Sequence, residues 1–334
     1  MLKPVSFAII TTSVIAIVIS LFSPAVHVAA VENSQGSGQA LEISPPVLTL
    51  SGNPGQTIKS QISLRDISKG SLRVTGQVND FVANGEDGTP KILMDETEPN
   101  PYSLKSWIAP LPSLLLKPQQ IENLPVTVKI PADAAPGGYY GVVRFTATPP
   151  ELEGTGVSLS ASLGALILMT VNGAAKEGLT IEEFSVNSGN GKAKTVFEST
   201  PLTFVQRFKN TGNIHEQPVG QVTITDMFGK KVAAINVNLL KNNILPQSIR
   251  KFEQKLDSSV LGKKKLFGKY TATLSATYGV NKQTVNSTTT FWVIPYTLIG
   301  IVIAALIVGF LGLRTLIKRY NRHIIKQATK AKRK

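Results

Sequence analysis

Residues 270–278 read YTATLSATY and alternate between apolar and polar side chains without a break. The apolar positions are Tyr270, Ala272, Leu274, Ala276 and Tyr278. Successive side chains of an extended chain point to opposite faces, so this period of two predicts a β-strand with one face buried. A helix would need its apolar residues three and four positions apart.

The same alternation recurs along the chain, for example in residues 72–78, 126–130 and 221–225. Glycine, proline, asparagine and aspartate separate these segments, as in residues 52–55 and 226–229, and these residue types favour turns. Residues 41–293 show no convincing helical periodicity. About seven strands in each half, with turns every 8 to 12 residues, predict an all-β protein of two tandem antiparallel immunoglobulin-like β-sandwiches.

Composition suggests where the domains begin and end. Residues 31–40 are polar and rich in glycine and serine, which is typical of a flexible leader. Residues 174–178 continue a stretch without periodicity and are predicted to link the two sandwiches. We therefore expect the first sandwich at residues 41–173 and the second at residues 179–292.

Residues 291–313 are uncharged and almost wholly apolar, long enough as a helix to cross a bilayer of about 30 Å. We expect a transmembrane helix at residues 293–313. The following tail, residues 314–334, holds nine lysines or arginines and no acid, which predicts a cytoplasmic location. The residues nearest the span that determine this topology are Arg314, Lys318, Arg319 and Arg322.

The N-terminus fits the same orientation. Residues 1–30 have the features of a signal peptide: Lys3, an apolar stretch, Pro24, and small residues up to Ala30. Retention as a first anchor is the alternative, because the apolar stretch is nearly long enough to span. Either outcome places residues 31–290 outside and predicts a single-pass type I protein of the cell membrane.

The net charge of +14 does not predict nucleic-acid binding. Ten of the 35 basic residues are Lys3 and the tail, which leaves 25 basic against 21 acidic residues, a charge of +4, in the remainder. A nucleic-acid-binding surface would need a concentrated basic face. The chain also has no cysteine, so core burial alone must stabilise the exported domains. An exported protein without cysteine is more typical of a bacterial surface than of a eukaryotic one.

Catalytic motifs are lacking in the sequence. His215 is the one histidine of residues 31–290, and no GxSxG or HExxH run is present. Glu182 and Glu183 are neighbours on a predicted strand and therefore face opposite ways. The acids of the predicted loop at residues 80–104 are expected to be solvated. We predict a protein that is not an enzyme and that needs no cofactor.

Residues 80–104 contain three prolines and two glycines and show little alternation. Segments this long without secondary structure are often binding loops. Disorder and a small extra hairpin are the alternatives. Asn79, Asp80, Asn84, Glu86 and Asp87 gather oxygen ligands that calcium accepts, but not at the spacing of a known calcium loop, which favours a polar surface loop.

Aromatic residues are the best candidates for a binding site, because saccharide rings and partner side chains both stack on them. The candidates are Tyr102, Trp107, Tyr139 and Tyr140. The alternative is that two or more of these rings belong to the core.

Several short stretches resemble one family, the WxL-interacting proteins of Gram-positive cell surfaces. In the first half they are Trp107-Ile108, Leu116-Lys117-Pro118, residues 126–131 (VTVKIP) and residues 135–143 (APGGYYGVV). In the second half they are residues 208–215 (FKNTGNIH), Pro218-Val219-Gly220, Asp226 with Gly229, Leu245-Pro246 with Arg250, Gly268-Lys269-Tyr270, and residues 291–295 (FWVIP).

This resemblance implies a layout of signal peptide, peptidoglycan-binding β-sandwich, second sandwich called the host-binding domain, transmembrane helix and basic tail. It implies peptidoglycan as a partner of the first domain and a WxL-type or host surface protein as a partner of the second. The expected function is attachment of wall glycan or a secreted WxL-type protein at the cell surface. The alternatives are a structural spacer in a multiprotein surface complex and, less favoured, an envelope glycan hydrolase.

Overall fold

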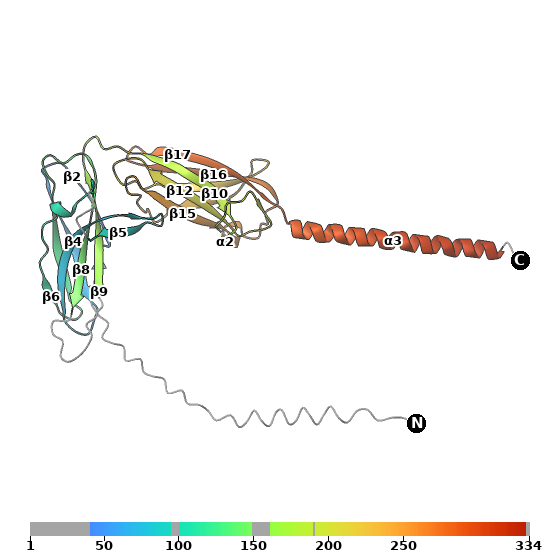
Figure 1. Ribbon diagram of the computed structural model, residues 1–334, viewed down its shortest axis with the longest axis horizontal. Helices are drawn as coiled ribbons and strands as arrows, with labels where there is room; N and C mark the ends of the chain where they lie inside the picture. The colour runs from blue at the N-terminus through green and yellow to red at the C-terminus, as the bar shows by residue number, and fades with distance from the viewer. Residues whose placement is uncertain (1–40, 95–99, 149–160, 190, 332–334) are drawn as a thin grey trace, which may run out of the picture. The chain divides into compact units, whose positions relative to one another are not determined.

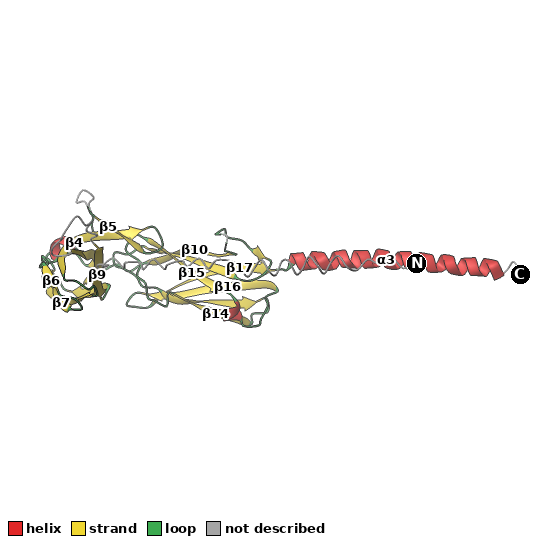
Figure 2. Ribbon diagram, turned by 90° about the horizontal axis from the view of Figure 1, so that it is seen from below, coloured by secondary structure: helices red, strands yellow, loops and turns green. Residues whose placement is uncertain are grey.

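The computed structural model describes residues 41–94, 100–148, 161–189 and 191–331. The predicted signal peptide and leader lie outside the described residues, as do Asp95, Glu96 and Glu98. Strands form both domains and a single long helix closes the described chain (Figures 1 and 2). The predicted fold class, two tandem immunoglobulin-like sandwiches with a C-terminal helix, is confirmed.

The first sandwich consists of two sheets. Its strands are β1 (Leu41–Ser44), β2 (Val47–Gly52), β3 (Thr57–Asp66), β4 (Leu72–Asn84), β5 (Thr89–Leu93), β6 (Leu114–Leu116), β7 (Ile121–Lys129), β8 (Gly137–Thr148) and β9 (Ala161–Val171). One sheet has the order β1-β3-β7, and the other has the order β2-β9-β8-β4-β5 with β6 also paired to β4. Among these described strands, all pairs are antiparallel except β2 with β9.

The second sandwich follows the same plan. Its strands are β10 (Leu179–Asn187), β11 (Val196–Phe197), β12 (Leu202–Asn210), β13 (Val219–Asp226), β14 (Lys231–Val237), β15 (Ile249–Leu256), β16 (Gly268–Tyr278) and β17 (Gln283–Val293). The sheets have the orders β10-β12-β15 and β11-β17-β16-β13-β14. Only the short pair of β11 with β17 is parallel among its described strands.

Each sandwich has its own core, built by the alternation that the sequence shows. In β16 the five apolar residues from Tyr270 to Tyr278 are all buried, as the pattern predicts. They belong to one buried cluster that also contains Phe204 and Phe208 of the facing sheet. In the first sandwich Leu64, Val128 and Phe145 are among the buried residues. Burying such side chains contributes on the order of 2 kcal/mol each, which lets these domains fold without disulfides.

The segment at residues 80–104 is more regular than a long loop. Strand β4 continues to Asn84, the chain turns through Gly85 and Gly88 at positive φ, and β5 returns antiparallel to β4. The hairpin alternative is therefore correct for residues 80–93. A one-turn 3₁₀ helix, η2 (Lys105–Trp107), follows.

Two helical features differ from the sequence prediction. Helix α2 (Ser258–Leu261) is one turn long, and the side chain of Asp257 caps it by accepting from the amide of Ser259. Helix α3 spans Tyr296–Ala331, so it begins three residues later than the expected residue 293. Phe291 and Val293 belong to β17 and are buried in the core. These inward-facing strand residues are apolar and directly precede the helix, so they made the apolar run of the sequence begin too early. Within α3, residues Tyr296–Arg322 are long and apolar enough to cross a membrane.

Candidate binding site

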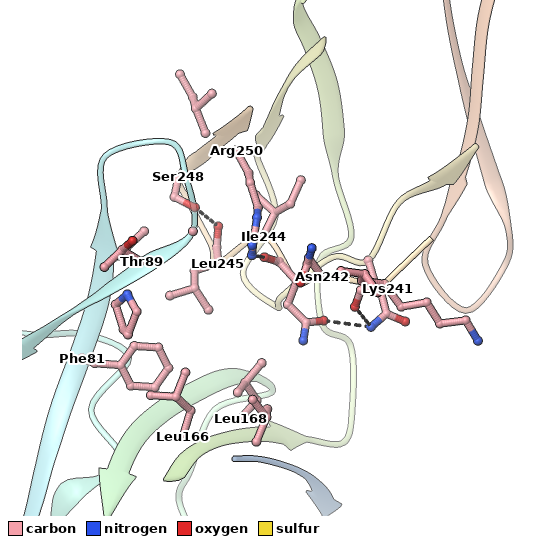
Figure 3. A pocket seen from close by; sticks show the side chains of 18 of the residues that line it. Phe81, Thr89, Leu166, Leu168, Lys241, Asn242, Ile244, Leu245, Ser248 and Arg250 are labelled. Atoms are coloured by element: carbon pink, nitrogen blue, oxygen red, sulfur yellow. Dashed lines mark hydrogen bonds between the residues drawn. The ribbon is translucent and has the colours of Figure 1, made fainter. Parts of the chain in front are cut away.

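A pocket of about 430 Å³ lies between strands of the first sandwich and loops of the second. Its floor is apolar: Phe81 comes from β4, Leu166 and Leu168 come from β9, and Leu245 comes from the loop before β15 (Figure 3). Polar groups of Asn242, Asn243 and Arg250 line the same pocket. An apolar concave surface with a few polar groups around it is the usual form of a binding site.

The floor exists because β9 is apolar on both faces. Ile167 and Met169 point into the core of the first sandwich, whereas Leu166 and Leu168 lie on the other face. On that face Leu168 forms a small buried cluster with Phe81, Tyr140 and Val142, against which Leu245 packs. The second sandwich thus covers part of an apolar sheet face, and the pocket is the part left open.

The loop between β14 and β15 is held by asparagine side chains. The amide of Asn238 donates to the carbonyls of Pro218 and Asn242, and its Oδ1 accepts from the Asn242 backbone N–H. Asn238 and Lys241 both adopt positive φ, a conformation that asparagine tolerates better than most residues. Leu240 lies in this fixed turn, lines the pocket and remains 85% exposed.

The tip of the β4–β5 hairpin contacts the second sandwich. Arg207 of β12 donates from Nε to Oε2 of Glu86 at 2.7 Å and from Nη2 to Oε1 of the same carboxylate. The backbone amide of Lys251, on edge strand β15, donates to the Glu86 carbonyl at 2.7 Å. The Arg207 guanidinium holds the pKa of Glu86 below its ordinary value. The hairpin therefore positions one wall of the pocket, including Thr89.

The four aromatic residues predicted as a binding site form two separate pairs. Trp107 and Tyr139 pack with ring centroids 4.2 Å apart, and both are partly buried against the first core. The ring centroids of Tyr102 and Tyr140 lie 6.2 Å apart, and the side chain of Tyr140 is only 1% exposed. Tyr139 and Tyr140 are neighbours on β8 and therefore point to opposite faces. The structure does not bring the four rings into one site.

The prediction that Tyr140 contacts a ligand is not supported by its position, because a buried ring offers no stacking face. Its ring lies edge-on to Phe81 beneath the pocket floor, and burial raises its pKa. Its hydroxyl lies 3.4 Å from Nδ1 of His215 in the second sandwich. Tyr140 thus supports the floor and joins the two domains.

His215 is partly buried, its neighbour Glu216 is buried, and their pKa values shift in opposite directions. Burial lowers the pKa of His215 to about 4. Burial and the nearby Glu177 raise the pKa of Glu216 to about 7. Among the described residues no cluster of three or more histidines and acids is placed to hold a metal ion.

The oxygen-rich side chains that were weighed as calcium ligands make hydrogen bonds within the protein. Asp80 accepts from the amides of Leu104 and Lys105, and Asp87 accepts from the amide of Thr89. The side-chain amide of Asn79 donates to the Leu93 carbonyl. These side chains organise the hairpin, which agrees with the polar-loop interpretation.

Sequence reasoning missed the residues of the pocket. Leu239 and Leu240 stand between asparagines and a lysine in NLLKNN, residues 238–243, and both are exposed. An apolar pair inside so polar a turn is the signal that could have found Leu240, the member of the pair that lines the pocket. The floor residues Leu166 and Leu168 belong to an apolar stretch, residues 163–171, whose pattern does not separate one face from the other. The topology residues Arg314, Lys318, Arg319 and Arg322 lie on α3 and are exposed.

Comparison with known proteins gives distant likenesses only. No protein-family model matches the chain, and no curated protein matches it. Among solved structures, the class 5 fimbriae chaperone CfaA has 15% identity and a TM-score of 0.39, covering 75% of this chain and 98% of its own. The E. coli chaperone DraB has 14% identity and a TM-score of 0.34, covering 77% and 97%. A PapD-like domain of human CEP192 has 14% identity and a TM-score of 0.30, covering 46% and 99%. These scores are too low to carry a functional argument.

Proposed function

We propose that this chain is a membrane-anchored binding protein of a bacterial cell surface, and that it holds a partner protein in the pocket between its two sandwiches. The sandwiches face outward, α3 spans the membrane, and the cationic end of the chain lies in the cytoplasm. The observation that carries the proposal is the pocket: an apolar floor fixed by two domains, with amide and guanidinium groups beside it.

The chemistry of the pocket favours a protein segment with an apolar or aromatic side chain. Phe81, Leu166 and Leu168 offer apolar contact, and Arg250 supplies a cation of the kind that binds the face of an aromatic ring. The backbone groups of a peptide would find partners in Asn242 and Asn243. We assign the chain to the WxL-interacting proteins on the sequence resemblance, and a Trp-x-Leu segment is the probe that this pocket suits.

The assignment is tested with the full chain in detergent micelles and a fluorescein-labelled peptide that contains Trp-x-Leu. Leu240→Asp places a charge at the pocket without disturbing a core, since this side chain is 85% exposed. We expect Leu240→Asp to weaken binding by about tenfold or more in anisotropy titrations. Leu239→Asp is the matched control, because Leu239 is also exposed but does not line the pocket.

Absence of peptide binding, or equal weakening by both variants, would reject the pocket as the site. In that case the chain could still form a stable complex with envelope proteins, and neither substitution would weaken it. That result supports the spacer alternative, in which the domains assemble through other surfaces. An envelope hydrolase would instead show activity on wall polymer that is lost when one carboxylate is neutralised. The described acids of the hairpin already serve structural hydrogen bonds.

A second candidate function is binding of wall glycan by the first sandwich, and one observation favours it. Trp107 and Tyr139 form a partly exposed aromatic pair, and Tyr139 is fixed by donating its hydroxyl to the Ala135 carbonyl at 3.0 Å. Soluble peptidoglycan fragments should then change the fluorescence of Trp107 in a Trp292→Phe background. Unchanged fluorescence at saturating fragment, together with no retention on purified wall, would count against this site.

A further inference from the structure

One end of the five-stranded sheet of the second sandwich carries exposed aromatic side chains. Phe228 lies in the β13–β14 turn and is 87% exposed, and Phe267 precedes β16 and is 69% exposed. Strand register places them at the same end, because Asp226 pairs with Tyr270 and Tyr270 pairs with Phe291 near the end of β17. Exposed aromatic residues that share one end of a domain mark an interaction surface.

The fold holds both phenylalanines in fixed turns. Oδ1 of Asp226 accepts from the amides of Phe228 and Lys230 at 2.9 Å each, and Gly229 supplies the positive φ that closes the turn. The hydroxyl of Tyr270 accepts from the amide of Phe267 and donates to its carbonyl. Both side chains are therefore presented outward by an ordered backbone, so little ordering is needed when they bind.

Lysines surround these rings. On the turn, on the α2–β16 loop and at the start of β16 there are six exposed lysines: Lys230, Lys231, Lys263, Lys264, Lys265 and Lys269. Three acids lie near this end, Glu198, Asp226 and Asp257, and the last two accept hydrogen bonds within their own turns. The surface formed by Met227, Phe228, Phe267 and the six lysines, hereafter the basal patch, is thus apolar and cationic.

The basal patch lies where the chain leaves the sandwich for α3. Gly268, next to Phe267, pairs with Val293, and α3 begins at Tyr296 after only Ile294 and Pro295. Three peptide links reach at most about 11 Å, so the first turn of α3 stays close to this end of the sheet. The basal patch therefore lies within reach of the headgroups of a bilayer that α3 enters.

We propose that the basal patch docks on the surface of the anionic bilayer that α3 enters. Phe228 and Phe267 insert among the headgroups, and the lysines bind lipid phosphates, as in other interfacial surfaces that combine aromatic and basic residues. The inference rests on the proposed membrane anchoring by α3. It adds that the second sandwich lies against the membrane rather than standing free above it.

The test uses the full chain in lipid nanodiscs with tryptophan as the probe. The chain has two tryptophans, so Trp107→Phe with Trp292→Phe gives a silent background. Phe228→Trp then places the probe in the basal patch. Val280→Trp is the matched control, because Val280 is also 87% exposed but lies in the β16–β17 turn at the opposite end of the sheet. Circular dichroism of each variant verifies folding.

In discs of brominated phosphatidylcholine with phosphatidylglycerol, we expect the Phe228→Trp probe to be quenched about twofold and the Val280→Trp probe to be unaffected. Lys263→Glu with Lys265→Glu should reduce that quenching, whereas Lys241→Glu with Lys282→Glu should not. Equal emission from the two probes in discs that carry the chain overturns the docking proposal. Failure of the chain to co-elute with discs overturns the anchoring itself, so the two failures are distinguishable.

A second copy of the chain is the competing occupant of the basal patch. Quenching that appears only in discs holding two chains, and not in discs holding one, would assign the patch to self-association and overturn docking on lipid. Quenching that is equal in discs of pure phosphatidylcholine would reject the role given to the lysines.

Discussion

Arg207 donates two hydrogen bonds to the carboxylate of Glu86. The two residues belong to different sandwiches and lie 121 positions apart in the sequence. Bidentate pairs of this kind fix geometry as well as contributing energy. The pair brings the β4–β5 hairpin onto the edge strand β15, where the Glu86 carbonyl also accepts from the Lys251 amide. One wall of the pocket therefore depends on a contact that neither domain makes alone.

Arg207→Ala should loosen the hairpin without unfolding either core. The pair is about one-third exposed, so we expect a local loss of about 0.5–1 kcal/mol, or roughly two- to fivefold faster amide exchange in residues 84–93 and 249–256. Hydrogen-exchange mass spectrometry of the full chain measures this. Arg65→Ala removes the more exposed 3.7 Å pair with Glu42 and should leave those peptides unchanged. The pKa of Glu86 is lowered, so the effect of Arg207→Ala should be complete above the ordinary value of 4.5 and disappear as the pH falls below it.

Gly88→Ala should disturb the pocket more than Gly85→Ala. Both glycines have positive φ, so each substitution costs about 1–2 kcal/mol in backbone strain. A Cβ at Gly88 would also overlap the guanidinium of Arg250, whereas a Cβ at Gly85 meets open space. Exchange of the Lys251 amide, which the hairpin protects, should rise further in Gly88→Ala. Equal rates in the two variants would contradict the contact.

Glu216→Gln should stabilise the protein at neutral and alkaline pH. The folded-state pKa of about 7 lies above the ordinary 4.5, so the folded state binds more protons between these values and stability falls as the pH rises through them. Replacing the carboxyl with an amide removes that loss. We expect a gain of about 1–3 kcal/mol above pH 7 and none below pH 4.5, measured by urea unfolding monitored through intrinsic fluorescence. The exposed Glu182→Gln should give no gain at either pH.

His215→Gln should reduce the loss of folding stability on the acid side of the pH profile. The folded-state pKa of about 4 lies below the ordinary 6.5, so the unfolded state binds more protons in this interval and stability falls as the pH drops from 6.5 towards 4. The same unfolding measurement should show a shallower acid slope in His215→Gln than in the unmodified chain. An unchanged slope would mean that the imidazole is not buried as neutral base against Tyr140.

The sequence pattern predicted those parts of the fold that depend on local alternation. Strand β16 buries all five residues that its period of two selects, and the class of two sandwiches follows from many strands of that kind. Residues that face another domain behaved differently. Leu168 and Tyr140 lie on the sheet face opposite the first core, in strands that are apolar on both faces, and Leu245 packs on that face. Alternation states which residues share a face and leaves open what that face contacts.

The candidate site was less predictable for the same reason. Glu86 and Asp87 were assigned to a polar surface loop, because hairpins with a four-residue connection and a proline in the return strand show little alternation. The partners that give these acids their role are Thr89, close by, and Arg207, remote in sequence. The start of α3 was predicted too early. Phe291 and Val293 are apolar because they face the core as part of β17, and they lie just before the apolar helix.

The two-residue junction between β17 and α3 has a mechanical consequence. The backbone amides of Trp292 and Ile294 donate to the carbonyls of Thr195 and Phe197, so the last residues before the anchor are bonded along β11. A pull on the anchor reaches β17 through two residues only, so it loads these bonds and the ladder that joins β17 to β16. Tension from a bound partner would then pass from β17 to the helix through Ile294 and Pro295 alone, without a flexible linker between them.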